Sequence, residues 1–156
     1  MEKLIVLLKE LQYTLSSMES CTGGLFASEL TGISGASAVF KGSLVSYANK
    51  IKEDVGNVGS CLITKHGVLS KEVALAMALN AQELFKSDVA VSFTGNAGPN
   101  TLEGKPVGLV FSAMVVKEKT LVFEDYYQGK RNEIRKAIVK KTIERLLEIL
   151  QEEKNG

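Results

Sequence analysis

The 156-residue chain contains few of the residues from which metal centres and disulfide frameworks are built. It has no tryptophan, one histidine, two cysteines and two prolines. One histidine and the absence of a Cys-x-x-Cys pair argue against a structural zinc site. Two isolated cysteines, Cys21 and Cys61, are typical of a protein in a reducing compartment. We therefore expect a cytoplasmic protein that contains no metal.

Neither sign of charge dominates the chain. Lysine and arginine together number 19 and the acidic residues 18, which gives a net charge of +1. Such a chain has no overall field with which to bind nucleic acid or an anionic membrane, so any phosphate group must be bound locally. The apolar run from Leu4 to Leu8 is too short to cross a bilayer and has no signal-peptide pattern. We expect no nucleic-acid partner and no membrane partner.

The remaining composition is that of an ordinary globular domain. Apolar residues make up 45% of the chain and charged residues 24%, and the length suits one hydrophobic core. Neither an internal repeat nor a low-complexity linker interrupts the sequence. Residues 1–156 are therefore interpreted as a single domain.

Hydrophobic periodicity predicts an alternation of helices and strands. Helices are expected over residues 4–11, from Gly23-Gly24, after the N-cap Ser70 and from Asn132 onward, with a turn or helix from Asn49. Strands are expected at about 14–18, 39–47, 88–94, 107–116 and 120–127, the last two forming a hairpin. This alternation predicts an α/β fold, a three-layer α/β/α sandwich, and the hairpin implies a mixed β-sheet.

The segment from Met18 to Gly24 is the first that could carry chemistry. Ser20 stands between a predicted strand and the predicted helix, in a turn that exposes its Oγ near backbone N–H groups. Such N–H groups at a helix N-terminus can bind an oxyanion or a phosphate. Equally, Ser20 or Thr22 can be a plain N-cap of the helix. The segment is not Gly-x-Ser-x-Gly, and it allows both interpretations.

A nucleophilic serine needs a base, and the sequence offers two kinds. The only histidine, His66, could pair with Ser20 or with Cys21, but it precedes Gly67 and could as easily end a short helix. A lysine can serve when burial lowers its pKa from ~10.4 toward ~7, which corresponds to roughly 4 kcal/mol of environmental bias. Lys52 lies just beyond a predicted strand end, where loops assemble sites. The alternative is a solvated lysine on a helix face.

Two further segments are suited to ligand binding. The segment from Thr94 to Pro99 follows a buried strand, and its glycines allow the backbone to approach a ligand closely, although a surface turn is the alternative. Arg131 and Arg135 are four residues apart at the start of the last helix, so both can lie on one side of its first turn. Two cations at the positive end of the helix dipole are unfavourable, and a phosphate bound there would offset this cost. The alternative is that both arginines are solvated.

In combination these segments resemble the C-terminal domain family of the competence/damage-inducible protein CinA. The matching pieces are Glu19-Ser20-Cys21-Thr22-Gly23-Gly24, Val45-Ser46-Tyr47-Ala48-Asn49-Lys50-Ile51-Lys52, His66-Gly67-Val68-Leu69-Ser70, Thr94-Gly95-Asn96-Ala97-Gly98-Pro99, Lys105-Pro106-Val107-Gly108 and Gly129-Lys130-Arg131-Asn132-Glu133-Ile134-Arg135. The resemblance extends over about residues 10–150. It leaves no room for the larger N-terminal domain of some relatives, so the chain resembles the stand-alone form.

The resemblance implies a nicotinamide mononucleotide deamidase, an amidohydrolase of pyridine nucleotide salvage that yields nicotinate mononucleotide and ammonia. It implies Ser20 as the nucleophile and Lys52 as the base of a Ser-Lys dyad, with Tyr47 orienting the lysine or steadying the intermediate. It further implies that Thr94 contacts the substrate and that Arg131 binds the 5′-phosphate. The other substrate contacts expected from the two glycine-containing turns are Thr22, Gly23, Gly95, Ala97 and Gly98. Neither a metal nor an organic cofactor is required.

The chain departs from the family's usual pattern in its substrate-binding segments. Asn96 replaces an apolar residue, the stretch from Asn100 to Gly104 is less glycine-rich, and Lys130 replaces an aspartate. Two alternatives therefore accompany the deamidase hypothesis: an amidase for a related nucleotide amide, and a catalytically silent nucleotide-binding domain acting in competence or damage response. In each case the partner is a small-molecule nucleotide, and the apolar N-terminal helix is compatible with a homo-oligomer.

Overall fold

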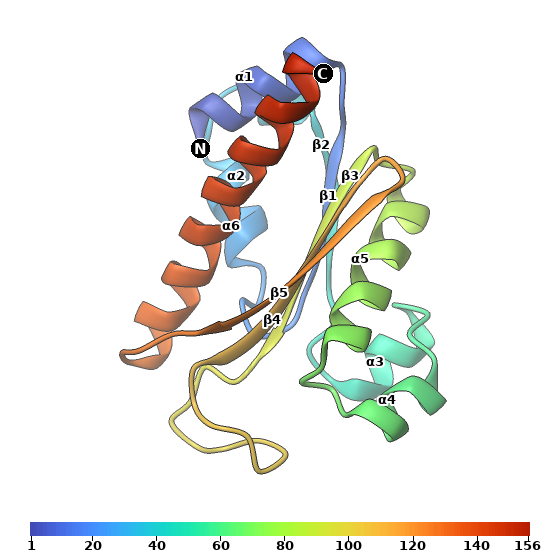
Figure 1. Cartoon of the computed structure of the whole chain (residues 1–156), viewed down its shortest axis with the longest axis vertical. Helices are drawn as coiled ribbons and strands as arrows, with labels where there is room; N and C mark the ends of the chain where they lie inside the picture. The colour runs from blue at the N-terminus through green and yellow to red at the C-terminus, as the bar shows by residue number, and fades with distance from the viewer.

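The computed structural model describes all 156 residues as six α-helices, one short 3₁₀ turn and five strands (Figure 1). In chain order the elements are α1 (Glu2–Leu11), β1 (Leu15–Glu19), α2 (Leu25–Thr31), η1 (Ala36–Ala38), β2 (Phe40–Val45), α3 (Asn49–Asp54), α4 (Ser60–His66), α5 (Lys71–Phe85), β3 (Val89–Gly95), β4 (Leu109–Val116), β5 (Lys119–Tyr126) and α6 (Arg131–Asn155). No helix is both long and apolar enough to cross a membrane.

The five strands form one sheet in the order β2-β1-β3-β4-β5. Strand β1 pairs in parallel with β2 and β3, whereas β4 pairs antiparallel with both β3 and β5. The prediction of a mixed sheet with a terminal hairpin is thus confirmed. Because β1, β2 and β3 run in one direction, their carboxyl ends meet at one edge, where Glu19 pairs with Val45 and with Phe93. Open α/β sheets bind their ligands at such an edge.

Helices cover both faces of the sheet, which confirms the predicted three-layer α/β/α sandwich. Helices α1, α2 and α6 lie together on one face, and α3, α4 and α5 lie on the other (Figure 1). The larger core lies beneath the first group and includes the fully buried side chains of Leu4, Leu8, Phe26, Phe93 and Leu150. Two smaller cores lie between the sheet and the second group of helices. The long α6 spans the outer layer, so its first turn reaches the edge where the parallel strands end (Figure 1).

The first strand is displaced by one residue from the predicted boundaries, and this matters for the site. Thr14 is not part of β1; its N–H and Oγ1 donate to Asp88 Oδ2 at 2.8 and 2.9 Å. This side-chain contact ties the beginnings of β1 and β3 together, a long-range pairing that local periodicity cannot reveal. The strand therefore ends at Glu19 rather than Met18, and Ser20 follows it directly.

The helix α5 begins as its sequence predicts, whereas α4 was anticipated only at its end. Ser70 is the N-cap of α5, and its Oγ accepts a hydrogen bond from the Val73 N–H at 3.2 Å. Helix α4 ends at His66, before Gly67, as the sequence suggested. None of the α4 residues is fully buried, and only Leu62 and Ile63 pack partly against the core, which is too few for the apolar stripe that sequence reasoning depends on.

Candidate active site

Ser20 opens the turn that joins β1 to α2. Its N–H donates to Phe93 O at 3.1 Å and its carbonyl accepts from the Gly23 N–H at 2.9 Å, so Ser20 contributes to the turn through its backbone. The N-cap residue of α2 is Gly24, in a left-handed conformation with φ 97°, a conformation that favours glycine. The N-cap is therefore neither Ser20 nor Thr22, and the Ser20 Oγ is directed into a cavity.

The capping of α2 is done by Glu19, a residue that the sequence reasoning missed. Its fully buried carboxylate accepts hydrogen bonds from the N–H groups of Phe26 and Ala27, both at 3.1 Å, in the first turn of α2. Thr22 Oγ1 donates to it at 2.7 Å and Ser43 Oγ at 3.1 Å. One carboxylate thus joins β1, the serine turn, α2 and β2. The sequence signal was an acidic residue just ahead of a helix whose own N-cap is a glycine.

Glu19→Ala is expected to lower the free energy of unfolding by about 3 kcal/mol or more, because buried donors lose a charged acceptor. Glu19→Gln preserves the volume and one acceptor oxygen, so it should lose less. The exposed Glu29 of α2, the helix that Glu19 caps, supplies a matched control: Glu29→Ala should change stability by less than about 0.5 kcal/mol. Urea denaturation measures all three variants. Equal losses for Glu19→Ala and Glu29→Ala would contradict the capping role.

Lys52 is the one buried lysine of the chain, with 1% of its surface exposed. It lies on α3, and its Nζ is 3.0 Å from Ser20 Oγ. The same Nζ donates to the backbone carbonyls of Ser46, at 2.7 Å, and Tyr47, at 3.2 Å. Burial lowers the pKa of Lys52 from 10.5 to about 8, and no carboxylate is bonded to the amine to oppose this shift.

The three contacts define what Lys52 can do chemically. A charged ammonium has three N–H donors, and all three have an acceptor here. The neutral amine has only two N–H donors; the two carbonyls accept both, which turns its lone pair toward Ser20 Oγ. The lowered pKa of Lys52 makes that neutral form accessible at mildly alkaline pH. The pair therefore has the geometry of a nucleophile and its general base.

The structure separates the other candidate base and nucleophile. His66 ends α4 and lies 3.6 Å from the Glu72 carboxylate, and it does not line the cavity that contains Ser20. Cys21 does line that cavity, but burial raises the pKa of its thiol to about 12, so the thiol stays protonated. Neither a Ser20–His66 pair nor a Cys21–His66 pair is formed.

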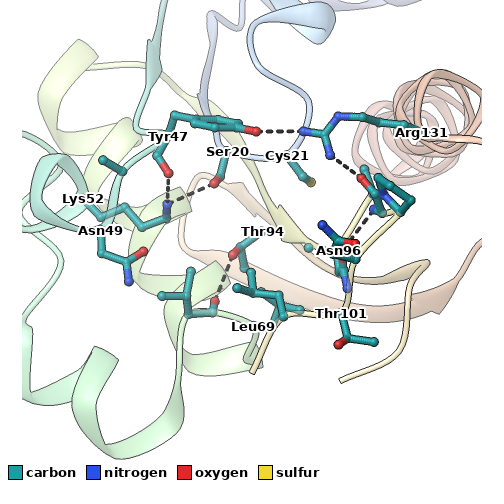
Figure 2. Close-up of a pocket in the computed structure, with 18 residues that line it drawn as sticks. Ser20, Cys21, Tyr47, Asn49, Lys52, Leu69, Thr94, Asn96, Thr101 and Arg131 are labelled. Carbon is teal, nitrogen blue, oxygen red and sulfur yellow. Dashed lines mark hydrogen bonds between the residues drawn. The ribbon is translucent and has the colours of Figure 1, made fainter. Parts of the chain in front are cut away.

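The cavity has a volume of about 440 Å³ and is bounded by the serine turn, the segment after β2, the loop after β3 and the first turn of α6 (Figure 2). Eight of the ten predicted site residues line it: Ser20, Tyr47, Lys52, Thr94, Gly95, Ala97, Gly98 and Arg131. The lining residues that the sequence reasoning did not select are Cys21, Ala48, Asn49, Val68, Leu69, Asn96, Pro99, Asn100, Thr101 and Leu102. Five of these lie in the loop after β3, and the other five lie just after β1 or at and before the starts of α3 and α5.

Thr22 and Gly23, the two remaining predicted contacts, do not line the cavity. The Thr22 hydroxyl donates to the Glu19 carboxylate. The Thr22 carbonyl accepts a hydrogen bond from Arg135 Nη2 at 2.7 Å. The Gly23 N–H is occupied by Ser20 O. Within the expected oxyanion-binding segment, the N–H of Cys21 has no backbone acceptor and belongs to a cavity-lining residue. It is the best-placed backbone donor for a developing oxyanion.

Arg131 reaches across the rim of the cavity (Figure 2). Its Nη1 donates to Gly98 O and its Nη2 donates to the Tyr47 hydroxyl at 2.8 Å. A guanidinium has five N–H donors, so three remain for a ligand. Arg135, predicted to lie beside it, instead braces the serine turn, because its guanidinium contacts Asn132 and the turn's backbone. One arginine of the pair is thus left at the cavity.

Tyr47 contributes to the site mainly through its backbone. Its carbonyl helps to orient the Lys52 amine, whereas its hydroxyl accepts from Arg131 at the rim. Tyr47 as a whole residue is 58% exposed. The resemblance implied that this tyrosine orients the lysine, and the structure shows that its backbone carbonyl can do so. The aromatic ring of Tyr47 is placed to contact a ligand that enters the cavity.

Glycine at position 95, the last residue of β3, allows β4 to lie close against the strand just before the loop that follows it. A Cβ at Gly95 would lie 2.9 Å from Val110 Cα and 3.0 Å from Leu109 O, too close for any other residue without displacing β4. Thr94, one residue earlier, is fully buried and donates from Oγ1 to Val68 O at 2.9 Å. Its hydroxyl proton is therefore engaged, and only the oxygen remains for a ligand.

No group of three or more histidine, cysteine, aspartate or glutamate side chains is placed to bind a metal ion.

Comparison with known proteins gives one consistent answer. The sequence model of the CinA C-terminal domain family matches residues 1–150 of this chain. A putative competence-damage inducible protein of Bacillus pumilus is 44% identical over 139 residues, which cover 89% of this chain and 33% of that protein. A homologue with the same description from a Geobacillus species is also 44% identical, over 86% of this chain and 32% of that protein. The chain thus spans about a third of the length of these relatives.

Solved structures agree with this assignment at the level of the fold. The competence/damage inducible protein CihA from Agrobacterium tumefaciens is 38% identical, with a TM-score of 0.90 over 96% of this chain and 92% of that one. A CinA superfamily protein from Klebsiella pneumoniae superimposes with a TM-score of 0.94 over 96% of this chain and 94% of that one. At 24% identity the latter likeness concerns the fold alone.

Proposed function

The chain belongs to the CinA C-terminal domain family, and we propose that it hydrolyses the carboxamide of nicotinamide mononucleotide to nicotinate mononucleotide and ammonia. The observation that carries the proposal is the contact between the buried Lys52 Nζ and Ser20 Oγ, 3.0 Å apart at a cavity wall. A serine paired with a buried, partly neutral amine is an activated nucleophile for acyl transfer.

The residues support a two-step reaction. Neutral Lys52 accepts the proton of Ser20 as Oγ attacks the amide carbon, and the Cys21 N–H donates to the oxyanion that forms. The protonated amine then returns its proton to the leaving nitrogen, ammonia departs, and an ester on Ser20 remains. Water attacks this ester with the same amine as base. The carboxylate product leaves and Ser20 recovers its proton.

The remainder of the cavity suits a mononucleotide. Its volume of about 440 Å³ lies within the range of small-molecule sites, roughly 300–1,000 Å³. Arg131 presents its unused N–H donors at the rim, where a phosphate can make charge-assisted hydrogen bonds. With the phosphate at Arg131, the amide end of the substrate is directed toward Ser20.

The direct test is incubation of the purified protein with nicotinamide mononucleotide, with ammonia and nicotinate mononucleotide measured together. Stoichiometric formation of both products is expected. Ammonia from another nucleotide carboxamide, but not from this one, would favour an amidase of altered specificity. Nucleotide binding measured by calorimetry without any turnover would overturn the proposal in favour of a silent nucleotide-binding domain.

The pH dependence of the reaction should reflect Lys52. The amine must be neutral to act as a base, so kcat/KM is expected to rise with pH through an inflection near 8 and to fall about tenfold per pH unit below it. A pH–rate profile from pH 6 to 9.5 measures this. The inflection should persist in Cys21→Ala, because the pKa of this thiol lies far above the range. An inflection that disappears in that variant would assign it to the cysteine instead.

A further inference from the structure

The side-chain amide of Asn96 has a donor with no partner in the protein. Asn96 directly follows β3, is 6% exposed and lines the Ser20 cavity. Its Oδ1 accepts the Gly98 N–H at 3.0 Å, whereas its Nδ2 is buried and forms no hydrogen bond. A buried donor left without an acceptor costs about 1–3 kcal/mol. Such a group is explained when a ligand supplies the missing acceptor.

The orientation of this amide is fixed by its surroundings. Exchanging the amide oxygen and nitrogen would set Nδ2 against the Gly98 N–H, a contact between two donors. The Gly98 carbonyl in turn accepts from Arg131, so a short chain of bonds connects Asn96 to the arginine at the rim. In Figure 2, Asn96 lies on the side of Ser20 away from Lys52 and close to the loop that Arg131 contacts. The free Nδ2 therefore belongs to the loop that connects the Ser20 cavity to the guanidinium at its rim.

We propose that Asn96 is a substrate-binding residue whose Nδ2 donates a hydrogen bond to an oxygen of the sugar that links the amide-bearing ring to the phosphate. This inference rests on the proposed function, because the positions of the two ends of the substrate define what lies between them. With the amide carbon at Ser20 and the phosphate at Arg131, the intervening group is a ribosyl unit. Its hydroxyl and ring oxygens are acceptors, which the free donor requires.

The consequence is a preference for glycosylated amides over free ones. A site with a buried donor discriminates strongly against a ligand that leaves the donor unpaired. The free base nicotinamide has the reacting carboxamide but no sugar oxygen, so it gains nothing from Asn96. The sugar contact is a binding contact present before and during the reaction, so its loss should appear in KM rather than in kcat.

Asn96→Asp is the informative variant because it preserves the shape and the Oδ1 contact to the Gly98 N–H while removing the Nδ2 donor. It should raise KM for nicotinamide mononucleotide about 3- to 10-fold or more, with kcat changed less than about twofold. In a Ser20→Ala background the Kd from calorimetry should rise by the same factor. Asn132→Asp introduces the same charge beside Arg131, outside the cavity, and serves as the matched control.

Nicotinamide riboside, which lacks the phosphate, separates the sugar contact from repulsion of the phosphate by the new carboxylate. The Asn96→Asp penalty should persist with the riboside. Three outcomes would overturn the inference and leave the proposed function intact. The first is unchanged KM and Kd in Asn96→Asp, and the second is a rise in KM confined to the phosphorylated substrate. The third is an equal rise in KM in Asn132→Asp. Absence of turnover by the wild type overturns the proposed function, and the calorimetric comparison then still decides the role of Asn96.

Discussion

Ser20→Ala is expected to lower kcat for amide hydrolysis by at least about 10³-fold, because it removes the atom that forms the acyl-enzyme. Binding of nicotinamide mononucleotide should be almost unchanged, since Arg131 and the loop after β3 are not altered. Ammonia release measures the first effect and calorimetry the second. The combination of lost turnover with retained binding is the signature of a missing nucleophile.

The Ser20→Ala substitution should leave the fold intact. Ser20 holds its turn through its N–H and its carbonyl, both of which alanine retains. Ser28, an exposed serine of the adjacent α2, provides the matched control, and Ser28→Ala should retain full activity. Turnover by Ser20→Ala within about tenfold of the wild type would eliminate this serine as the nucleophile. Electrospray mass spectrometry of the wild type during turnover, with detection of an acylated protein, gives an independent check.

Lys52→Met should cause a loss of similar size, about 10³-fold in kcat/KM, because methionine fills nearly the same space without a basic group. Lys50→Met is the control. Lys50 lies on the same helix α3, but it is exposed and pairs with Asp54 at 3.1 Å, so its loss should leave turnover unchanged. Comparable activity in the two variants would show that the buried amine is not the base.

Thermodynamic linkage separates the chemical role of Lys52 from its effect on folding. Its pKa is about 8 in the folded protein and 10.5 ordinarily, so between these values the unfolded chain binds a proton that the folded chain does not. The free energy of unfolding of the wild type should therefore rise with pH in this window, relative to Lys52→Met, by up to about 1.4 kcal/mol per pH unit. Urea denaturation at pH 8 and 9.5 measures the difference. A pH-independent difference would contradict the lowered pKa.

Local pattern was sufficient where each element carries its own signal. The N-cap at Ser70, the hairpin of β4 and β5 and the apolar stripe of α6 depend on residues a few positions apart, so sequence alone predicted them. The same holds for the family, since the short motifs around Ser20, Tyr47 and Arg131 follow one another in an order that is typical of it. The start of α4 was not predicted because only two of its side chains, Leu62 and Ile63, pack against the core and both are only partly buried.

Which of the candidate side chains meet depends on the tertiary structure. The sequence presented Ser20 as either a cap or a nucleophile, and Lys52 as either a base or a solvated lysine. Parallel pairing of β1 with β2 brings the two together although they are 32 residues apart, and the same packing removes the amine from water. Burial and a lowered pKa are properties of an environment supplied by several distant segments, so no window of sequence contains them.

The same reasoning applies to the two arginines and to Glu19. Helical spacing put Arg131 and Arg135 on one side of α6, but only the neighbouring elements assign one to the cavity and the other to the serine turn. Sequence patterns assigned no role to Glu19, and only the packing of α2 and β2 surrounds its carboxylate with donors. Local patterns in the sequence were enough to predict most of the elements, the mixed sheet and the family. The contact between Ser20 and Lys52, the cap of α2 and the free amide of Asn96 are visible only in the folded chain, because each depends on how the surrounding elements pack around these side chains.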